Sequence, residues 1–147
     1  MAKDNVCVFC GQTLRGFRPI PIACSSTTQT ACRSCANELS GSDQVERCRR
    51  ALVHDLADQP EALREYLEIA SGAEAHRPQC LACGGKLRFR ARERLDNTIY
   101  RDSIFSTGFT LQPACCPDCG RYAFFDPKIV GQNPFLAHLM QKDTTNP

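Results

Sequence analysis

The sequence has no tryptophan, few other aromatic residues and no long hydrophobic run. A helix that spans a bilayer needs about 20 consecutive apolar residues. No segment of the 147-residue chain offers such a run, so we expect no membrane segment. The first residues are polar and lack the apolar stretch of a secretory signal peptide, which predicts a cytoplasmic protein. Because only 7% of the residues are aromatic, we expect small cores that need a further source of stability.

Cysteine is the residue that the sequence has in excess, with 11 in the chain. Cytoplasmic thiols stay reduced, so a high cysteine content there favours metal binding over disulfides. Two C-x-x-C pairs can supply the four sulfur ligands of a tetrahedral Zn²⁺ ion. The pairs predict two structural zinc ions per chain. The first ligand set is Cys7, Cys10, Cys32 and Cys35, and the second is Cys80, Cys83, Cys116 and Cys119.

Three cysteines are left outside these pairs. Cys48 lies on the apolar stripe of a predicted helix and is expected in the core. Cys24 and Cys115 could each replace a proposed ligand. We favour Cys116 over Cys115 because Cys116 gives the x-x spacing and a glycine follows its pair. A thioredoxin-like redox C-x-x-C would follow a strand in a βαβ pattern, which the chain lacks.

The segment 1–57 has the order of a known zinc finger. Its first C-x-x-C is followed by Gly11, then by an insert long enough for a hairpin, and its second pair opens a helix. This order resembles the treble-clef finger. Apolar residues at 45, 48, 52 and 56 then predict a connecting helix whose cap is Ser42 or Asp43. The next segment, 58–78, is predicted to be a short helix that ends at Gly72 and a linker.

The segment 79–147 differs because each of its C-x-x-C-G motifs leads into a predicted strand. Alternating residues Phe105, Thr107, Phe109 and Leu111 can supply a third strand. This arrangement resembles a zinc ribbon. A short C-terminal helix should follow, with Asn133 as its cap and Pro134 in its first turn. The predicted fold class is therefore a small zinc-stabilised α+β protein: a treble-clef-like finger, a helical connector and a three-stranded zinc ribbon with a C-terminal helix.

Neither zinc site has the composition of a catalytic centre. Four thiolates close the coordination shell, whereas catalytic zinc keeps a position open for water and usually has His or carboxylate ligands. A nucleobase deaminase would also require an H-x-E motif, which none of the three histidines provides. The sequence has no glycine-rich phosphate loop and no nucleophile elbow. We therefore predict that the protein is not an enzyme and takes no small-molecule substrate.

Basic residues at alternate positions mark a candidate nucleic-acid surface. On a strand, alternate residues share one face, and arginine suits phosphate through its planar fork. The residues are Lys86, Arg88, Arg90, Arg92 and Arg94. The same alternation also occurs where a half-buried strand simply keeps one face in water. Exposed aromatic residues of this segment could stack on bases; the candidates are Tyr100, Phe105, Phe109, Tyr122, Phe124 and Phe125.

The net charge of the chain limits nucleic-acid binding to a local surface. Eight zinc-bound thiolates and two Zn²⁺ ions lower the formal charge of the chain from +2 to −2. Overall attraction to nucleic acid is then absent, and binding has to depend on a local basic patch. The charge is also uneven along the chain, because residues 41–79 are acidic and residues 80–147 are basic.

Two functions follow from these features. The first is a nucleic-acid-binding protein, for DNA or RNA, that serves as a regulator or accessory subunit of a bacterial or phage-like nucleoprotein complex of the transcription or CRISPR effector type. Zinc ribbons, which this segment resembles, often serve such machinery. The alternative is a protein interaction adaptor, since four-cysteine treble clefs resemble the docking zinc domains of chaperone–protease ATPases. One subunit could do both, with a protein partner held by one module.

Overall fold

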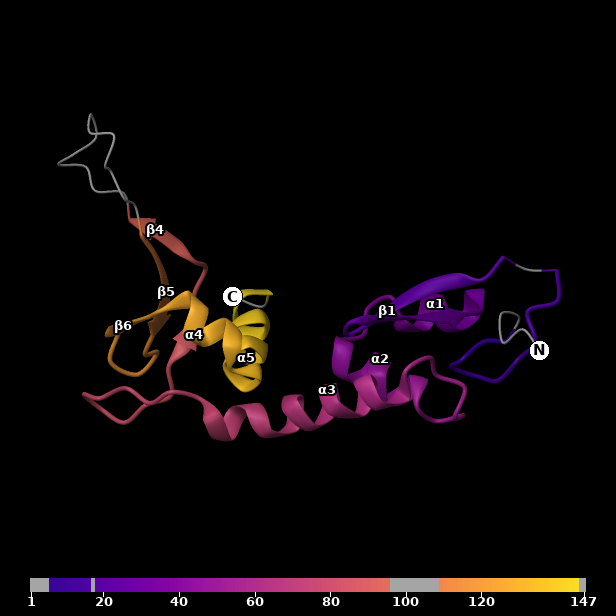
Figure 1. The fold of residues 1–147 in the computed structure, drawn as a ribbon, viewed down its shortest axis with the longest axis horizontal. Helices are drawn as coiled ribbons and strands as arrows, with labels where there is room; N and C mark the ends of the chain where they lie inside the picture. Colours follow the sequence, from indigo (N-terminus) through magenta and orange to yellow (C-terminus); the bar gives the residue numbers. More distant parts are fainter. Residues whose placement is uncertain (1–5, 17, 96–108, 146–147) are drawn as a thin grey trace, which may run out of the picture. The chain divides into compact units, whose positions relative to one another are not determined.

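The protein forms two compact units, Met1–Ala70 and Ser71–Pro147, in a computed structural model that describes residues 6–16, 18–95 and 109–145 (Figure 1). Both units combine short strands with helices, so the small α+β class is found as predicted. The division into segments 1–57, 58–78 and 79–147 stays a prediction. Within the described ranges, no helix has both the length and the apolar character that a bilayer crossing requires.

The N-terminal unit is built around one hairpin and two helices. Strand β1 (Ile20–Cys24) pairs antiparallel with β2 (Thr27–Ala31), and helices α1 (Arg33–Leu39) and α2 (Gln44–Ala51) follow. Asp43 caps α2, as one of the two predicted candidates, because its carboxylate accepts the Glu46 N–H at 2.8 Å. Helix α2 ends earlier than the apolar stripe suggested, so Leu56 packs on the core from beyond the helix.

A buried glutamine fixes the chain between α2 and helix α3 (Pro60–Gly72). The amide of Gln29, which is fully buried in β2, donates to the Asp58 carbonyl at 2.8 Å and accepts the Asp58 N–H at 2.9 Å. Buried amides are nearly always hydrogen-bonded. Here the Gln29 side chain bonds the backbone of Asp58 and so fixes the segment that leads into α3. Leu63 of α3 is buried in the core of this unit.

The C-terminal unit has a sheet with β5 (Phe109–Cys115) in its centre. Strands β3 (Arg88–Phe89) and β4 (Glu93–Leu95) pair with one edge of β5, and β6 (Tyr122–Phe125) pairs with the other (Figure 1). All pairs are antiparallel. The predicted third strand is β5, although it starts at Phe109; Phe105 and Thr107 lie outside the described residues.

The strand expected to run through residues 86–95 is interrupted between β3 and β4. Phe89 lies opposite Ala114 and Glu93 opposite Leu111, so three residues, 90–92, face only two residues of β5. This is the count of a β-bulge. Pro113 gives a physical reason, because it accepts the Arg90 N–H at 2.9 Å but has no N–H to return. The side-chain amide of Gln112 donates to the Arg90 carbonyl instead, at 2.6 Å.

Helices cover one face of this sheet. Helices α4 (Pro127–Gln132) and α5 (Pro134–Thr145) bury Val130 and Leu139 against Phe89, which meets Phe125 edge to face at 5.6 Å. Asn133 caps α5 as predicted, since its side-chain oxygen accepts two N–H groups at the helix start, at 3.0 and 3.1 Å. Helix α4 was not predicted, although Asp126 and a proline after it are a typical helix start.

An ion-pair network fastens the chain at the start of this unit. Residues expected as a linker form a 3₁₀ turn, η2 (Ala73–His76), and Arg77 after it is 6% exposed in its side chain. Its guanidinium contacts Asp143 of α5 at 2.6 Å and Glu74 at 2.7 Å. The hydrogen bond from Arg77 lowers the pKa of Glu74 to about 2. Asp143 also accepts the Phe89 N–H at 2.9 Å, so the network joins η2, β3 and α5.

Candidate metal centres

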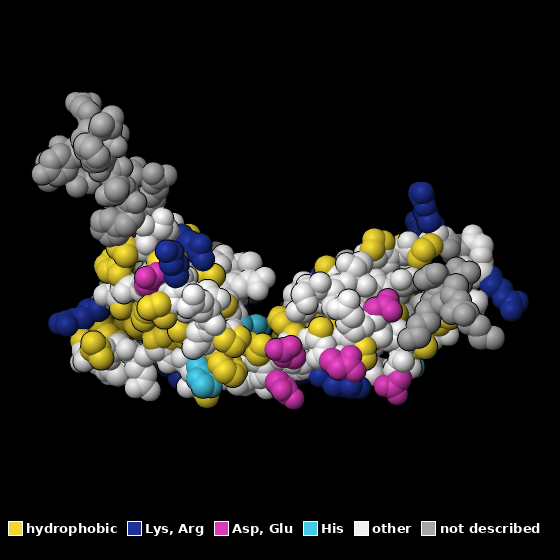
Figure 2. Space-filling model, in the orientation of Figure 1, with side chains coloured by type: hydrophobic (Ala, Val, Ile, Leu, Met, Phe, Trp, Pro, Cys, Tyr) yellow, Lys and Arg dark blue, Asp and Glu magenta, His cyan; other side chains and the backbone are white. Residues whose placement is uncertain are grey.

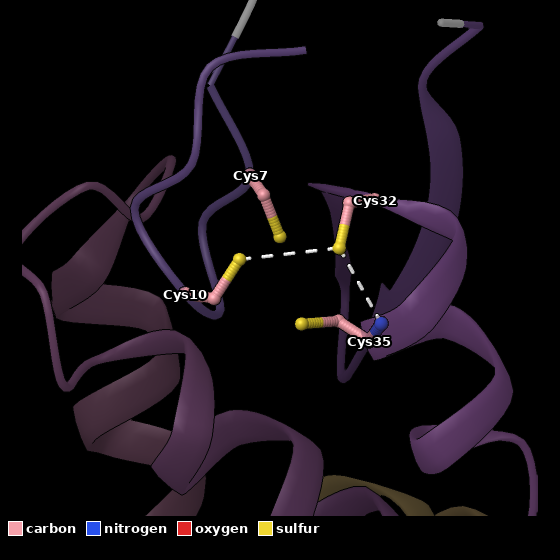
Figure 3. A group of neighbouring side chains, drawn as sticks. All are labelled: Cys7, Cys10, Cys32 and Cys35. Atoms are coloured by element: carbon pink, nitrogen blue, oxygen red, sulfur yellow. Dashed lines mark hydrogen bonds between the residues drawn. The ribbon is translucent and has the colours of Figure 1, made fainter.

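The first predicted ligand set comes together in the N-terminal unit, where all four sulfur atoms lie within 4.8 Å of one another. Figure 3 shows the side chains pointing toward a common centre, two from a loop and two from the start of α1. Cys32 is the N-cap of that helix, and its sulfur accepts the Cys35 N–H at 3.4 Å. The helix start therefore orients one ligand pair, and the loop at Cys7 and Cys10 orients the other.

The second predicted set comes together in the C-terminal unit, again with all sulfur atoms within 4.8 Å. Its ligands come from two loops. Cys80 and Cys83 precede β3, and Cys116 and Cys119 lie between β5 and β6. No helix start contributes to this site.

The spacing of the sulfur atoms fits zinc in both units. A tetrahedral ion with Zn–S bonds of about 2.3 Å places its sulfurs about 3.8 Å apart. The distance from Cys10 Sγ to Cys32 Sγ is 3.9 Å. In the C-terminal site, the Sγ distances are 3.7 Å for Cys80 to Cys119 and 3.5 Å for Cys83 to Cys116. Donor type and geometry together fit two zinc ions per chain.

Three of the four ligand pairs share one backbone turn. In each, the first cysteine donates its N–H to the carbonyl five residues later, and the glycine four residues later donates its N–H back to that cysteine, all at 2.7–2.9 Å. The glycines have φ of +71°, +74° and +73°, a region in which a side chain is strained. This explains why a glycine follows each of these three pairs, at Gly11, Gly84 and Gly120.

The electrostatics of the thiols also call for a cation. Backbone N–H groups of Ala82 and Cys83 lower the pKa of Cys80 to about 7. In the other site, burial opposes ionisation of Cys7, but backbone N–H groups lower its pKa to about 7 as well. The pKa of Cys83 shifts in the opposite direction: the Gly85 N–H favours its thiolate, yet neighbouring sulfurs raise its pKa to about 12. Four thiolates in such a space need a positive ion to neutralise them.

The cysteines outside the pairs do not join either cluster. Cys24 and Cys48 are both fully buried in the N-terminal core, where their thiols interact with each other, which lowers the pKa of Cys24 and raises that of Cys48. Cys48 thus lies in the core as expected. The structure brings Cys116 into the C-terminal cluster, whereas the Cys115 thiol donates to the Cys116 carbonyl at 3.6 Å.

The basic residues form a shorter row than the sequence suggested. Lys86, Arg88 and Arg90 are exposed and alternate with two buried side chains, Leu87 and Phe89. Arg90 still donates its N–H to Pro113, whereas Arg92 is exposed but lies in the part of the interruption beyond it. Arg88 lies opposite Cys115, and an unbroken strand would place Arg94 opposite residue 109. Arg94 instead lies opposite Thr110, so the pairing has shifted by one residue between the two arginines. The prediction of five cations on one strand face is therefore corrected by the bulge; the side chain of Arg94 lies outside the described residues.

The candidate stacking residues divide into two groups. Phe125 packs against the core of its unit. Tyr122 and Phe124 are 58% and 56% exposed. Tyr100, Phe105 and the side chain of Phe109 lie outside the described residues. The structure thus leaves two aromatic side chains accessible on β6.

Comparisons with protein-family models, with curated proteins and with solved structures found no match to this chain. The fold and the two cysteine clusters therefore carry the functional inference by themselves.

Proposed function

We propose that this protein is a non-enzymatic, zinc-stabilised module that binds nucleic acid through a basic row, which we define as Lys86, Arg88 and Arg90. The observation that carries the proposal is the alternation of these exposed cations with buried Leu87 and Phe89. Burial of the intervening residues fixes the strand, so the cations keep one direction. Such an array favours a partner with anionic groups in a line, which a phosphate backbone supplies.

The charges of the basic row are available for a partner. Among the described residues, no Asp or Glu forms an ion pair with Lys86, Arg88 or Arg90. By contrast, Arg50 and Arg77 in the rest of the chain are paired with carboxylates. Unpaired cations spaced along one strand repel one another, and phosphate contacts would relieve that repulsion.

The zinc sites serve this proposal as scaffolds. Each has four thiolate donors, which close the shell of a zinc ion and leave no position for a reacting water. In the N-terminal unit, the order of cysteine loop, β1–β2 hairpin and α1 supports a treble-clef-like finger. In the C-terminal unit, two cysteine loops that lead into β3 and β6 support a zinc ribbon. The role of regulator or accessory subunit in a nucleoprotein complex stays a prediction from that resemblance.

Salt-dependent binding tests the proposal. Fluorescence anisotropy of the zinc-loaded chain with a labelled oligonucleotide should show affinity that falls steeply with salt. Replacing Arg88 and Arg90 with Gln should weaken binding and reduce the slope of log K against log salt by about 1.4 to 1.8, since each phosphate contact contributes about 0.7 to 0.9.

The control replaces two exposed arginines of the N-terminal unit, Arg33 and Arg49, with Gln. Both double variants lose the same charge, so a loss confined to the Arg88 and Arg90 variant locates the contact on the basic row. Equal losses in the two variants, or no salt-sensitive binding by the unmodified chain, would contradict the proposal.

The acidic helix α3 favours a second candidate, the protein interaction adaptor. Glu61, Glu65 and Glu68 are exposed at helical spacings of four and three, so they share one side of α3. Figure 2 shows acidic side chains gathered along this helix. A protein partner with a basic surface would remain bound after nuclease treatment and be lost when Glu61 and Glu65 are replaced by Lys. Retention of that partner by the charge-reversed variant would exclude this surface.

A further inference from the structure

Arg88 of β3, Arg90 just after it and the exposed aromatic residues of β6 lie on the same face of the sheet. Arg88 is the register partner of Cys115, and Cys115 is in turn the partner of Tyr122. Residues directly opposite each other in an antiparallel pair project their side chains to one side. Arg88 and Tyr122 therefore end one row that crosses the three strands β3, β5 and β6.

A second row lies two residues further along on the same face. Pro113 is the register partner of Phe124. On its other side, it accepts the Arg90 N–H at 2.9 Å, which places Arg90 opposite it. Two rows therefore run in parallel, each with an arginine at one end and an aromatic ring at the other. The arginine and the ring of a row stand two strand spacings apart, about 9.6 Å.

The core of the unit does not use these two rings. The opposite face of the sheet carries Phe89 and Phe125, which pack under α4 and α5. Tyr122 and Phe124 remain more than half exposed, with ring centroids 6.5 Å apart and ring planes at 23°. Two large exposed rings in nearly parallel planes present flat apolar surface to solvent. In the C-terminal unit, hydrophobic and Lys or Arg side chains lie next to one another (Figure 2).

A groove shares two residues with this surface, Tyr122 and Phe124. It has a volume of about 450 Å³ and is lined by Arg121–Phe125 on one side and by residues 78–82 and Leu87 on the other. No residue of β5 is among those that line it. Its walls are mostly apolar, and Arg121 adds a cation at its end of the strand.

We propose that this face binds single-stranded nucleic acid, with unstacked bases lying on Tyr122 and Phe124 and with backbone phosphates on Arg88 and Arg90. The inference rests on the proposed function and narrows its partner. Charge complementarity favours a polyanion, and the rings favour one whose aromatic faces are free. A duplex hides its base faces in the stack, whereas a single strand offers them to protein rings.

The chemistry of the face also predicts how the sugar is treated. The six positions of the two rows are arginine, cysteine, proline and aromatic residues, without an amide or carboxylate. Discrimination of RNA from DNA needs a partner for the 2′-hydroxyl. Arg88, Arg90 and the Tyr122 hydroxyl can also form hydrogen bonds, but in this proposal the arginines bind phosphates and the tyrosine ring stacks on a base. We therefore expect DNA and RNA strands of equal length to bind with similar affinity.

Anisotropy with labelled oligothymidylate, oligouridylate and a duplex of equal length tests this inference on the zinc-loaded full chain. We expect the duplex to bind about tenfold or more weakly than the single strands, because it offers no base face to stack. Tyr122→Ala and Phe124→Ala should each weaken single-strand binding by about 5- to 150-fold, the range measured for loss of one stacking platform. Their salt slope should equal that of the unmodified chain, since no phosphate contact is lost.

Two controls separate stacking from folding. Tyr122→Phe keeps the ring and should bind like the unmodified chain, while Ile129→Ala removes an exposed apolar side chain of α4 and should have no effect. Each variant is used only with two zinc ions per chain. This inference would be overturned if both alanine variants bound like the unmodified chain while replacement of Arg88 and Arg90 with Gln still weakened binding. The proposed function would then remain. Equal affinity for duplex and single strand would also overturn the inference. Absence of salt-sensitive binding would contradict both the inference and the proposed function.

Discussion

The two zinc sites use the same four donors but are built into their units differently. In the N-terminal site, Cys7 and Cys35 are buried in a core that includes Phe9 and Leu39. In the C-terminal site, Cys80 and Cys116 are buried but Cys83 and Cys119 are exposed. The N-terminal site therefore has no exposed ligand, whereas the C-terminal site has two ligands in the core of its unit and two that are exposed.

The difference follows from what supplies the second ligand pair. A helix start holds Cys32 and Cys35, and the rest of α1 buries Ala36 and Leu39 behind them. In the C-terminal unit, both pairs lie on turns with the same backbone hydrogen bonds, which need no packing partner. That unit has instead a buried ion pair between Arg77 and Asp143. Ligands are part of the hydrophobic core in both units, and the C-terminal unit has a buried ion pair in addition.

The largest expected effect is the loss of a whole unit when a ligand is removed. Cys35→Ser should lower the zinc content from two ions to one and unfold the N-terminal unit, because zinc contributes about 10–16 kcal/mol in zinc-finger peptides against a domain stability of about 5–15 kcal/mol. Cys119→Ser is the matched change in the other unit. Metal analysis together with amide NMR spectra measures both results. Release of both zinc ions by either substitution would show that the two sites depend on each other and would contradict their assignment to separate units.

A smaller effect is expected from the ion pair, and only in the C-terminal unit. Arg77→Ala leaves the carboxylate of Asp143, which is 8% exposed, without its partner. Breaking a buried pair in this way costs about 3–5 kcal/mol. Lys142→Ala is the control, since its pair with Glu74 is solvent-exposed at 3.1 Å and should contribute less than about 1 kcal/mol. Urea unfolding followed by NMR signals of each unit gives the values; equal losses in the two variants would argue against a buried network.

The smallest effect concerns the order in which thiols react. Under limiting chelator, an alkylating reagent should modify Cys83 and Cys119 before Cys7 and Cys35, because only the former two are exposed. Mass spectrometry of peptides taken over time gives the order. Earlier labelling of Cys7 and Cys35 would show that burial in the core does not protect the N-terminal site.

Local patterns in the sequence predicted the parts that depend on short spacings. The eight clustered cysteines follow from four C-x-x-C pairs, and the caps Asp43 and Asn133 follow from residue type and position. The strand at 86–95 was only partly predicted. Its interruption depends on Pro113 in a strand distant in sequence, which has no N–H to return to Arg90. The residue pattern of one strand does not show that a residue of the neighbouring strand lacks an N–H group.

The two faces of β6 are a similar case, since Tyr122 and Phe124 alternate with Ala123 and Phe125, and the sequence does not indicate which pair is buried. Packing of Phe125 against Phe89 decides it. The turn η2 was likewise not predicted, because the segment was expected to be a linker. The ion pair that fastens it joins Arg77 to Asp143, which lies 66 residues away in the chain.

The sequence by itself determined which cysteines form ligand pairs and how the turns of three of these pairs bend, since both depend on residues within five positions of one another. Only the tertiary structure decided which ligands are buried and which cations share a face with which rings. Burial and strand register arise from contacts between segments far apart in the chain, so no local pattern carries them.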